Sequence, residues 1–204
     1  MGQLYILHAA KLLLSVWLKT NTGYNHLRIF LGDRLFMASQ DSTTPCKQLA
    51  KPSLTNPIHM LAFGLGSGLS PKAPGTMGTI AALPIYWWLL ADLSTLWLSV
   101  VILVTFVVGV YAAHKTSEDL GVHDHGGIVI DEWVGMWITM LMVPKDWVWL
   151  AVGFALFRFF DILKPWPIKW LDTHVHGGFG IMIDDVLAGV MALGCMHLLL
   201  NFLA

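Results

Sequence analysis

Charged residues are scarce in this sequence. Asp, Glu, Lys and Arg together make up 12% of the 204 residues, about half of their share in an ordinary soluble domain. The formal net charge is −1, and the chain has no extended run of lysine or arginine. These features exclude a basic nucleic-acid surface as the organising feature of the molecule, so we expect no nucleic-acid partner.

Cysteine is also nearly absent. Cys46 lies in a polar stretch and Cys195 lies inside the last apolar run, and their spacing matches no zinc motif. We therefore expect no disulfide and no cysteine-bound metal.

Hydrophobic sequence is abundant, at 56% of the chain. Four or five apolar segments can be distinguished, and three of them approach the ~20 residues that a straight membrane-spanning helix requires. The segments cover residues 79–91, 96–113, 133–143, 147–163 and 186–203. Tryptophans lie near their ends, as is typical of the headgroup boundary, although Trp137 fits packing between helices equally well. The pattern predicts an all-α fold, a polytopic membrane bundle of about four to five membrane helices with re-entrant or interfacial pieces.

The third apolar segment is the least typical, because Pro144 ends it after eleven residues. It could extend backward through Glu132 and Asp131, tilt, or stay inside the bundle.

The loops fall into two groups if all five segments cross the membrane. The long loops at 64–78, 114–130 and 164–183 then share one side, and the short loops at 92–95 and 144–146 share the other. Most lysines lie on the long-loop side, so the positive-inside tendency places that side in the cytoplasm.

The amino-terminal part differs from the rest. Residues 1–36 make a poor signal peptide because Lys11 interrupts their apolar run and no basic region precedes it. We expect either that Met37 is the biological start or that 1–36 is a dispensable extension; a peripheral amphipathic helix is the alternative. The expected division is an extension or tail over 1–52 and a membrane domain over 53–204.

Two acidic pairs, Asp131–Glu132 and Asp184–Asp185, each follow an isoleucine and precede an apolar run. Acids at a helix start can simply cap it, since they interact with unpaired N–H groups and the helix dipole. Two such pairs on one side of a membrane also suit a hard cation such as Mg²⁺, because carboxylate oxygens are its preferred ligands.

A charged stripe is expected where Arg158, Asp161 and Lys164 follow one another at intervals of three residues. This spacing keeps all three on one side of a helix. Charges are disfavoured in lipid, so the stripe should turn inward toward the acidic pairs. It could form an internal ion pair, or its excess positive charge could bind an anion such as phosphate.

The glycine-rich stretch GLGSGLSPKAPGTMG, residues 64–78, precedes a helix expected to start near Thr79. Close backbone approach and Lys72 could favour an anion there, although the spacing is not that of a P-loop and a tight surface turn is the more common explanation.

Two H-x-H-G-G stretches contain His123, His125, His174 and His176. Imidazoles could ligate zinc or iron. Loop histidines more often bind phosphate, orient a carboxylate or have no such role.

Four stretches together resemble one known family. LAFGLGSGLSPKAPGTMGT, VHDHGGIVIDEWVGMWI, FRFFDILKPWPI and HGGFGIMIDDVLAGV are similar to the successive motifs of phosphatidylglycerophosphatase A, a bacterial inner-membrane phosphatase of phospholipid synthesis. The likeness covers about residues 53–204 and leaves 1–36 outside.

The resemblance implies Mg²⁺-dependent removal of the terminal phosphate of phosphatidylglycerophosphate, which gives phosphatidylglycerol, with the active site on the cytoplasmic side of the bilayer. The expected metal ligands are Asp131, Glu132, Asp184 and Asp185, and the expected phosphate-binding residues are Lys72, Arg158 and Lys164. Asp161 could be a ligand, an orienting group or a base acting on water. Metal-activated water and a covalent aspartyl-phosphate both remain open, because they use the same residue types.

Two alternatives remain at this point. One is a phosphatase of another lipid phosphate, and the other is a transporter or cation-binding membrane protein that uses its acids without turnover. A lipid transferase that uses a CDP-alcohol is disfavoured, because the D-G-x-x-A-R pattern is absent.

Overall fold

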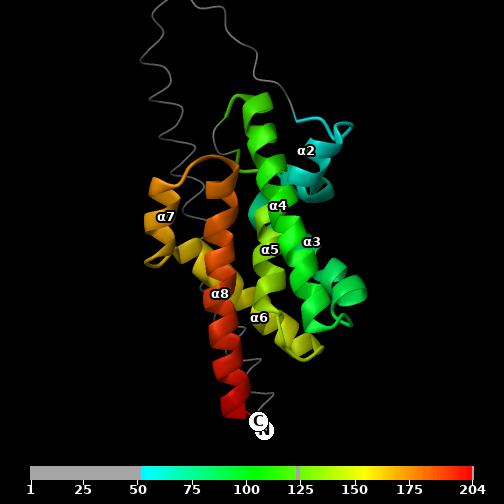
Figure 1. Ribbon diagram of the computed structural model, residues 1–204, viewed down its shortest axis with the longest axis vertical. Coiled ribbons are helices and arrows are strands. Elements are labelled where there is room, and N and C mark those ends of the chain that lie inside the picture. Colours follow the sequence, from blue (N-terminus) through cyan, green and yellow to red (C-terminus); the bar gives the residue numbers. More distant parts are fainter. Residues whose placement is uncertain (1–51, 123–124, 204) are drawn as a thin grey trace, which may run out of the picture.

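The computed structural model describes residues 52–122 and 125–203, which are helical with no strand among them (Figure 1). This confirms the all-α prediction for the described residues, while the expected start at Met37 lies outside them. The elements in chain order are α2 (Pro57–Ala62), a 3-10 helix η1 (Gly64–Leu69), α3 (Pro74–Ile85), a π-helical segment η2 (Tyr86–Leu90), α4 (Thr95–Leu120), α5 (Ile130–Thr139), α6 (Trp147–Leu163), α7 (Ile168–His174) and α8 (Gly177–Leu203).

Two helices in the described part, α4 with 26 residues and α8 with 27, are long and apolar enough to cross a membrane. At ~1.5 Å per residue each of them is longer than the ~30 Å hydrocarbon layer. Helix α6 has 17 residues, and α3 continues into η2 for a similar length. Of the expected four to five membrane helices, two therefore meet the criterion of length and composition.

Helix α5 lies at the centre of the bundle. It packs most extensively on α8 and also contacts α3, α4 and α6. All of its ten residues except Asp131 are buried, so the short third segment stays inside the bundle. The indole N–H of Trp137 donates to the carbonyl oxygen of Ala82 at 3.2 Å, which shows that this tryptophan packs between helices.

Glycines bring α5 and α8 into close contact. A Cβ atom on Gly189 would lie only 2.5 Å from the carbonyl oxygen of Gly135, and small residues are what allow membrane helices to approach so closely. Asp131 and Asp185 lie four residues before these two glycines, and residues four apart share a helix face. The glycine contact therefore brings the two acidic residues toward each other.

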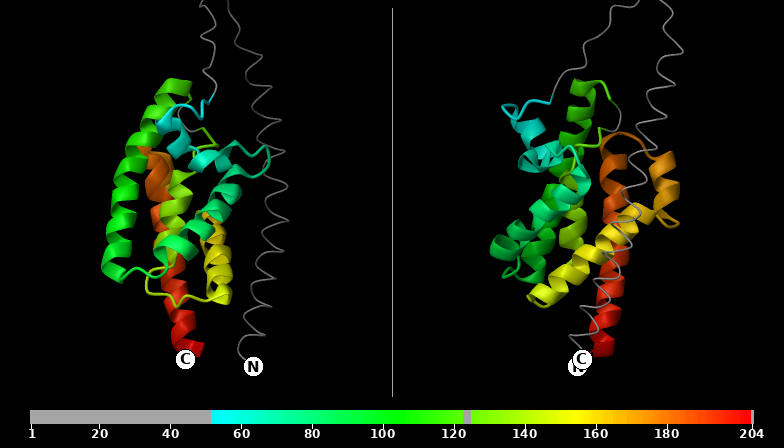
Figure 2. Two further views of the ribbon diagram at one scale, coloured as in Figure 1. Left: turned by 90° about the vertical axis from the view of Figure 1, so that its right-hand side faces the viewer. Right: turned by 180° about the vertical axis from the view of Figure 1, so that it is seen from behind.

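The links between helices gather at the two ends of the bundle, as the loop pattern predicts. At one end the short loops meet, since Lys145 Nζ lies 2.6 Å from Asp92 Oδ2 and the Trp87 and Trp147 rings stack with centroids 3.6 Å apart. Figure 2 shows both short links at the end toward which α8 runs. At the other end α2 contacts α4, where His59 Nε2 lies 3.3 Å from an Asp119 oxygen.

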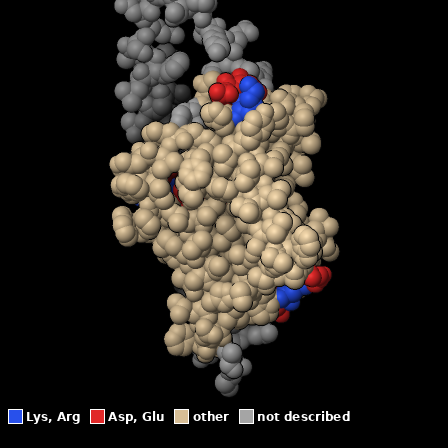
Figure 3. Space-filling view, viewed as in Figure 1, with Lys and Arg blue, Asp and Glu red and all other residues tan. Residues whose placement is uncertain are grey.

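One face of the molecule is largely uncharged. In Figure 3 charged side chains gather near the two ends of the molecule, and the face between them is uncharged apart from a small hollow. Along α4 the outward residues are large and apolar, including Leu96, Leu103 and Val107, each about 60% exposed or more. A continuous apolar surface of this size fits contact with lipid, so the protein is membrane-associated.

We predict that Gly189→Ala destabilises the bundle by about 2 kcal/mol, because the new methyl group would push α8 away from the backbone of α5. The thermal unfolding midpoint in detergent measures this loss. The matched control is Gly194→Ala on the same helix, where a Cβ atom would meet nothing within 4 Å. Equal midpoints for the two variants would contradict the proposed close contact.

Candidate functional site

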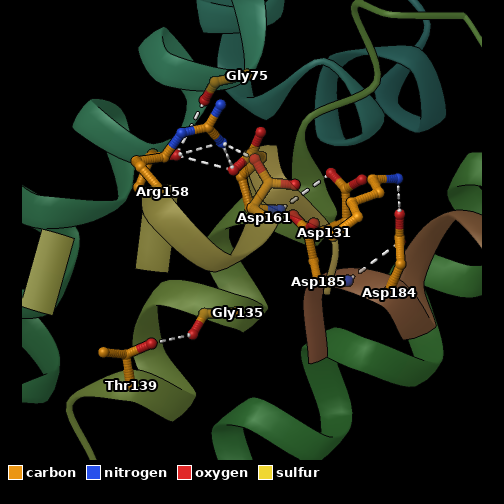
Figure 4. A network of polar contacts seen from close by, with 11 residues as sticks. Gly75, Asp131, Gly135, Thr139, Arg158, Asp161, Asp184 and Asp185 are labelled. Carbon is orange, nitrogen blue, oxygen red and sulfur yellow. Dashed lines mark hydrogen bonds and ion pairs between the residues drawn. The ribbon is translucent and has the colours of Figure 1, made fainter. Parts of the chain in front are cut away.

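Acidic and basic side chains from three helices come together in the half of the bundle that faces the long links (Figure 4). Helix α5 supplies an acidic pair in its first turn, α6 supplies an arginine and an aspartate, and α8 supplies the second acidic pair. One lysine follows directly after α6. The residues are Asp131, Glu132, Arg158, Asp161, Lys164, Asp184 and Asp185. The structure thus assembles all the predicted site residues except Lys72.

Arg158 is the centre of a buried ion network. Its guanidinium group forms an ion pair with Glu132 and lies 2.9 Å from Asp161 Oδ2. The Arg158 side chain is 8% exposed, so these charges compensate one another out of water. This confirms the alternative of an internal ion pair between Arg158 and Asp161, and the network includes Glu132 as well.

Helix α3 contributes Thr79 to this network. The Thr79 hydroxyl lies 2.8 Å from Glu132 Oε2, to which it donates, and 3.3 Å from Arg158 Nη1, from which it accepts. A Cβ atom on Gly75, one helical turn earlier, would lie 2.2 Å from Glu132 Oε1. Glycine at this position therefore leaves the space that the Glu132 carboxylate occupies.

The glycine-rich stretch differs from the expected loop. Helix α3 begins at Pro74, a residue favoured in the first turn because its missing N–H needs no partner there, and not near Thr79. Gly75 and Gly78 are consequently helical. The glycine-rich stretch was expected to approach a bound anion closely. In the structure Gly75 instead lies close to the Glu132 carboxylate of the protein itself.

Lys164 ends α6 in a left-handed conformation, with φ 41°. Its Nζ lies 2.5 Å from Asp184 Oδ2 and 2.8 Å from Asp172 Oδ1. Burial opposes the charged form, but the two carboxylates outweigh it and raise the pKa of Lys164 above its ordinary value, so the amino group stays protonated. The charged stripe thus turns inward as predicted, with Lys164 paired to α8 and α7.

Lys72 lies apart from this cluster. Its side chain is exposed on the link between η1 and α3, and within the described residues it forms no ion pair. Two of the histidines have aromatic neighbours: His125 packs edge-on against Phe63 and His174 stacks on Trp170, whereas His123 lies outside the described residues.

The acidic pairs differ in their helical setting. Asp131 and Glu132 lie in the first turn of α5, where the helix dipole favours acidic residues and Asp131 Oδ1 accepts from the Glu132 N–H at 3.0 Å. Helix α8 begins at Gly177, so Asp184 and Asp185 lie two turns inside it. Capping is therefore the wrong interpretation for the second pair.

The donor chemistry of the cluster suits a hard cation. Five carboxylates face two cationic groups, and Asp185 Oδ2 is buried with no hydrogen-bond partner, which is costly unless a donor or a cation satisfies it. Asp131 interacts electrostatically with Asp184, and Asp185 with Asp131. A divalent ion would relieve both the repulsion and the unpaired oxygen.

The cluster is not a closed metal site in this arrangement. Within residues 52–122 and 125–203 no group of three or more His, Cys, Asp or Glu side chains is arranged to hold a metal ion. Part of the acidic set is engaged by cations of the protein, since Arg158 pairs with Glu132 and Lys164 with Asp184. The residue types fit Mg²⁺, and binding it would require these ion pairs to loosen.

Three residues of the network were not predicted: Gly75, Thr79 as a participant, and Asp172. The first two lie within or next to the glycine-rich stretch, where their spacing of four residues could have indicated a shared helix face. Asp172 carries no such signal, because its contact with Lys164 depends on how α7 folds back after α6.

Comparisons with known proteins identify the family of this chain. The family model described as phosphatidylglycerophosphatase A matches residues 60–200. A phosphatidylglycerophosphatase A of Escherichia coli K12 is 53% identical over 154 residues, which are 74% of this chain and 89% of the relative. That of Haemophilus influenzae is 50% identical over 145 residues, 71% of this chain and 89% of the relative.

A third relative, from Bacteroides thetaiotaomicron, is 42% identical over 138 residues, 64% of this chain and 86% of the relative, and carries the provisional name phosphatidylinositol-3-phosphatase. No solved structure matches the chain. With the family match extending over most of the described residues and including every member of the ion network, the chain belongs to the phosphatidylglycerophosphatase A family.

Proposed function

We propose that the protein is a lipid phosphatase that hydrolyses the terminal phosphomonoester of phosphatidylglycerophosphate. The products are phosphatidylglycerol and inorganic phosphate, which places the reaction in phospholipid biosynthesis. The observation that carries the proposal is the buried network of carboxylates, Arg158 and Lys164 in an apolar bundle. Such a site can act on a phosphate at headgroup level while the acyl chains of the same molecule stay in the bilayer.

The proposed metal ligands are Asp131, Glu132, Asp184 and Asp185, with Mg²⁺ as the cofactor. When bound, Mg²⁺ supplies charge stabilisation at phosphate oxygens and lowers the pKa of a bound water. Glu132 also holds Arg158, so its carboxylate would be shared between the metal and the guanidinium group.

The cationic side chains act on the phosphate in this proposal. Arg158 and Lys164 bind its oxygens and stabilise the negative charge that moves through the transition state. Asp161, 2.9 Å from Arg158 Nη1, orients the guanidinium group. Lys72 lies at the same end of the bundle but outside the cluster, so it attracts an anionic headgroup at long range and does not bind the phosphate directly.

We further propose that the protein is a multi-pass protein of the bacterial inner membrane with its site on the cytoplasmic side. Helices α4 and α8 cross the bilayer, α6 and the continuous α3–η2 segment are the further candidates, and α5 remains inside. The end of the bundle near the site carries Lys115, Lys164 and Lys169, whereas Lys145 lies at the opposite end, which supports this orientation.

The name of the Bacteroides relative favours one alternative, a phosphatase of another lipid phosphate. Phosphate release from phosphatidylglycerophosphate, phosphatidylinositol 3-phosphate and phosphatidate in matched detergent micelles separates the two. We expect the highest kcat/KM for phosphatidylglycerophosphate. A higher value for either of the other lipids would overturn the substrate assignment, and no release from any of them would favour a cation-binding or transport protein.

Removal of divalent cations should abolish phosphate release, and added Mg²⁺ should restore it, because an all-carboxylate donor set prefers a hard ion. Zinc alone should not restore activity. The measurement is phosphate release by purified protein before and after exhaustive chelation. Full activity in the chelated protein would remove Mg²⁺ from the proposal.

Asp131→Asn and Asp184→Asn should each lower kcat by at least about 100-fold, since each removes a ligand charge while keeping the side-chain size. If both residues hold one metal, the double variant should be scarcely worse than either single variant, as expected for groups that act as a unit. Phosphate release and thermal unfolding are measured for all three. Multiplicative losses would count against a shared metal.

The proposed orientation is tested by single cysteines at positions 173 and 145 in a background without the native cysteines. A membrane-impermeant thiol reagent added to sealed inside-out vesicles should label position 173, whereas position 145 should react in intact spheroplasts. These positions lie at opposite ends of the bundle. Labelling of both from one side would contradict the proposed crossing pattern.

A further inference from the structure

The ion network is not equally accessible along its length. The exposed fraction of the side chain is 8% for Arg158 and 11% for Asp184, and it rises to 30% for Lys164 and 42% for Asp172. Figure 3 shows acidic and basic atoms at the base of a small hollow, away from the charged groups near the two ends, in the region where Figure 1 places α7 and α8. A phosphate that reaches the network from outside would therefore meet Lys164 before Arg158.

Lys164 has two carboxylate partners with different surroundings. Asp184 lies in α8 and interacts with the inner acidic cluster, including Asp161. Asp172 lies in α7 and bonds Lys164 Nζ at 2.8 Å from the outer side. Together these contacts hold the amino group between the inner cluster and the surface.

Metal binding would weaken the inner of these two contacts, the ion pair between Lys164 and Asp184. If Asp184 serves as a metal ligand, as proposed above, its carboxylate would be shared between the metal and Lys164, and its ion pair with the lysine would weaken. The lysine side chain is long and flexible, and fixing it in one conformation loses considerable rotamer entropy. Asp172 would then be the remaining carboxylate that keeps the amino group in place.

We propose that Asp172 is a positioning residue that holds Lys164 at the outer edge of the site, in the place where it binds the phosphate of the lipid. This inference rests on the proposed phosphate-binding role of Lys164. Asp172 itself touches neither the phosphate nor the metal, and its effect passes through the lysine amino group. In the opposite role the Asp172 carboxylate would compete with phosphate for Lys164, so the two roles shift KM in opposite directions.

Asp172→Asn should raise KM for phosphatidylglycerophosphate in detergent micelles about fivefold, as expected for a partly exposed ion pair. The inhibition constant of inorganic phosphate should rise by a similar factor, and the accompanying loss of kcat should stay far smaller than that of Asp131→Asn, because the metal ligands are untouched. Asp172→Glu keeps the charge and should recover most of the affinity. Asp92→Asn, which breaks the comparable ion pair with Lys145 at the other end of the bundle, is the matched control and should leave both constants unchanged.

A double-mutant cycle shows whether the effect passes through Lys164. In a Lys164→Ala background, Asp172→Asn should raise KM no further, because the group that it positions is gone. An unchanged or lower KM for Asp172→Asn, or an effect that persists in the Lys164→Ala background, would overturn the inference alone. An unchanged KM for Lys164→Ala itself would overturn the proposed phosphate role of that lysine, and the inference with it.

Discussion

The burial of Arg158 among carboxylates is the constraint on which the rest of the structure depends. A guanidinium group in an apolar bundle is stable only when opposite charges and hydrogen-bond acceptors surround it. Glu132 from α5, Asp161 from its own helix and Thr79 from α3 provide them. Three helices are thereby fixed relative to one another at the level of the site, which an apolar interface alone would do less specifically.

The same network links assembly to catalysis. Without a metal ion the cluster has more carboxylates than cationic side chains, so Arg158 and Lys164 neutralise only part of its negative charge. The glycine contact between α5 and α8 forces the carboxylates of the two helices together in spite of their repulsion. The close packing of small residues therefore creates a repulsion between carboxylates that a bound divalent ion would relieve. The protein need not form a separate, fully enclosed metal site for this ion.

Much of the site could be predicted from sequence, and the reasons are specific. Acidic pairs next to apolar runs and a charged stripe at intervals of three residues are costly in lipid, so their inward convergence followed from solvation alone. The grouping of the loops followed from the order of the apolar segments. The start of α3 was wrong because a glycine-rich stretch was interpreted as a loop, although Pro74 is well suited to a first helical turn. The capping of α8 by Asp184 was wrong because the helix begins in the glycines that precede the acidic pair. Asp172 could not be predicted, since its contact arises from the return of the chain through α7.

Helix α8 passes through two environments, a closely packed part inside the bundle and an exposed part at its C-terminal end. Its first half packs closely, with Gly178, Met182 and Asp185 buried, and Met196 is the last buried residue. Beyond it the helix extends past its neighbours (Figure 1), and Leu198 and Phe202 are 59% and 84% exposed. A side chain in the first half is constrained by shape, whereas one in the last turns needs only to be compatible with acyl chains. Natural variation along this helix should therefore change in character after Met196, from fixed residue identity to conserved hydrophobicity.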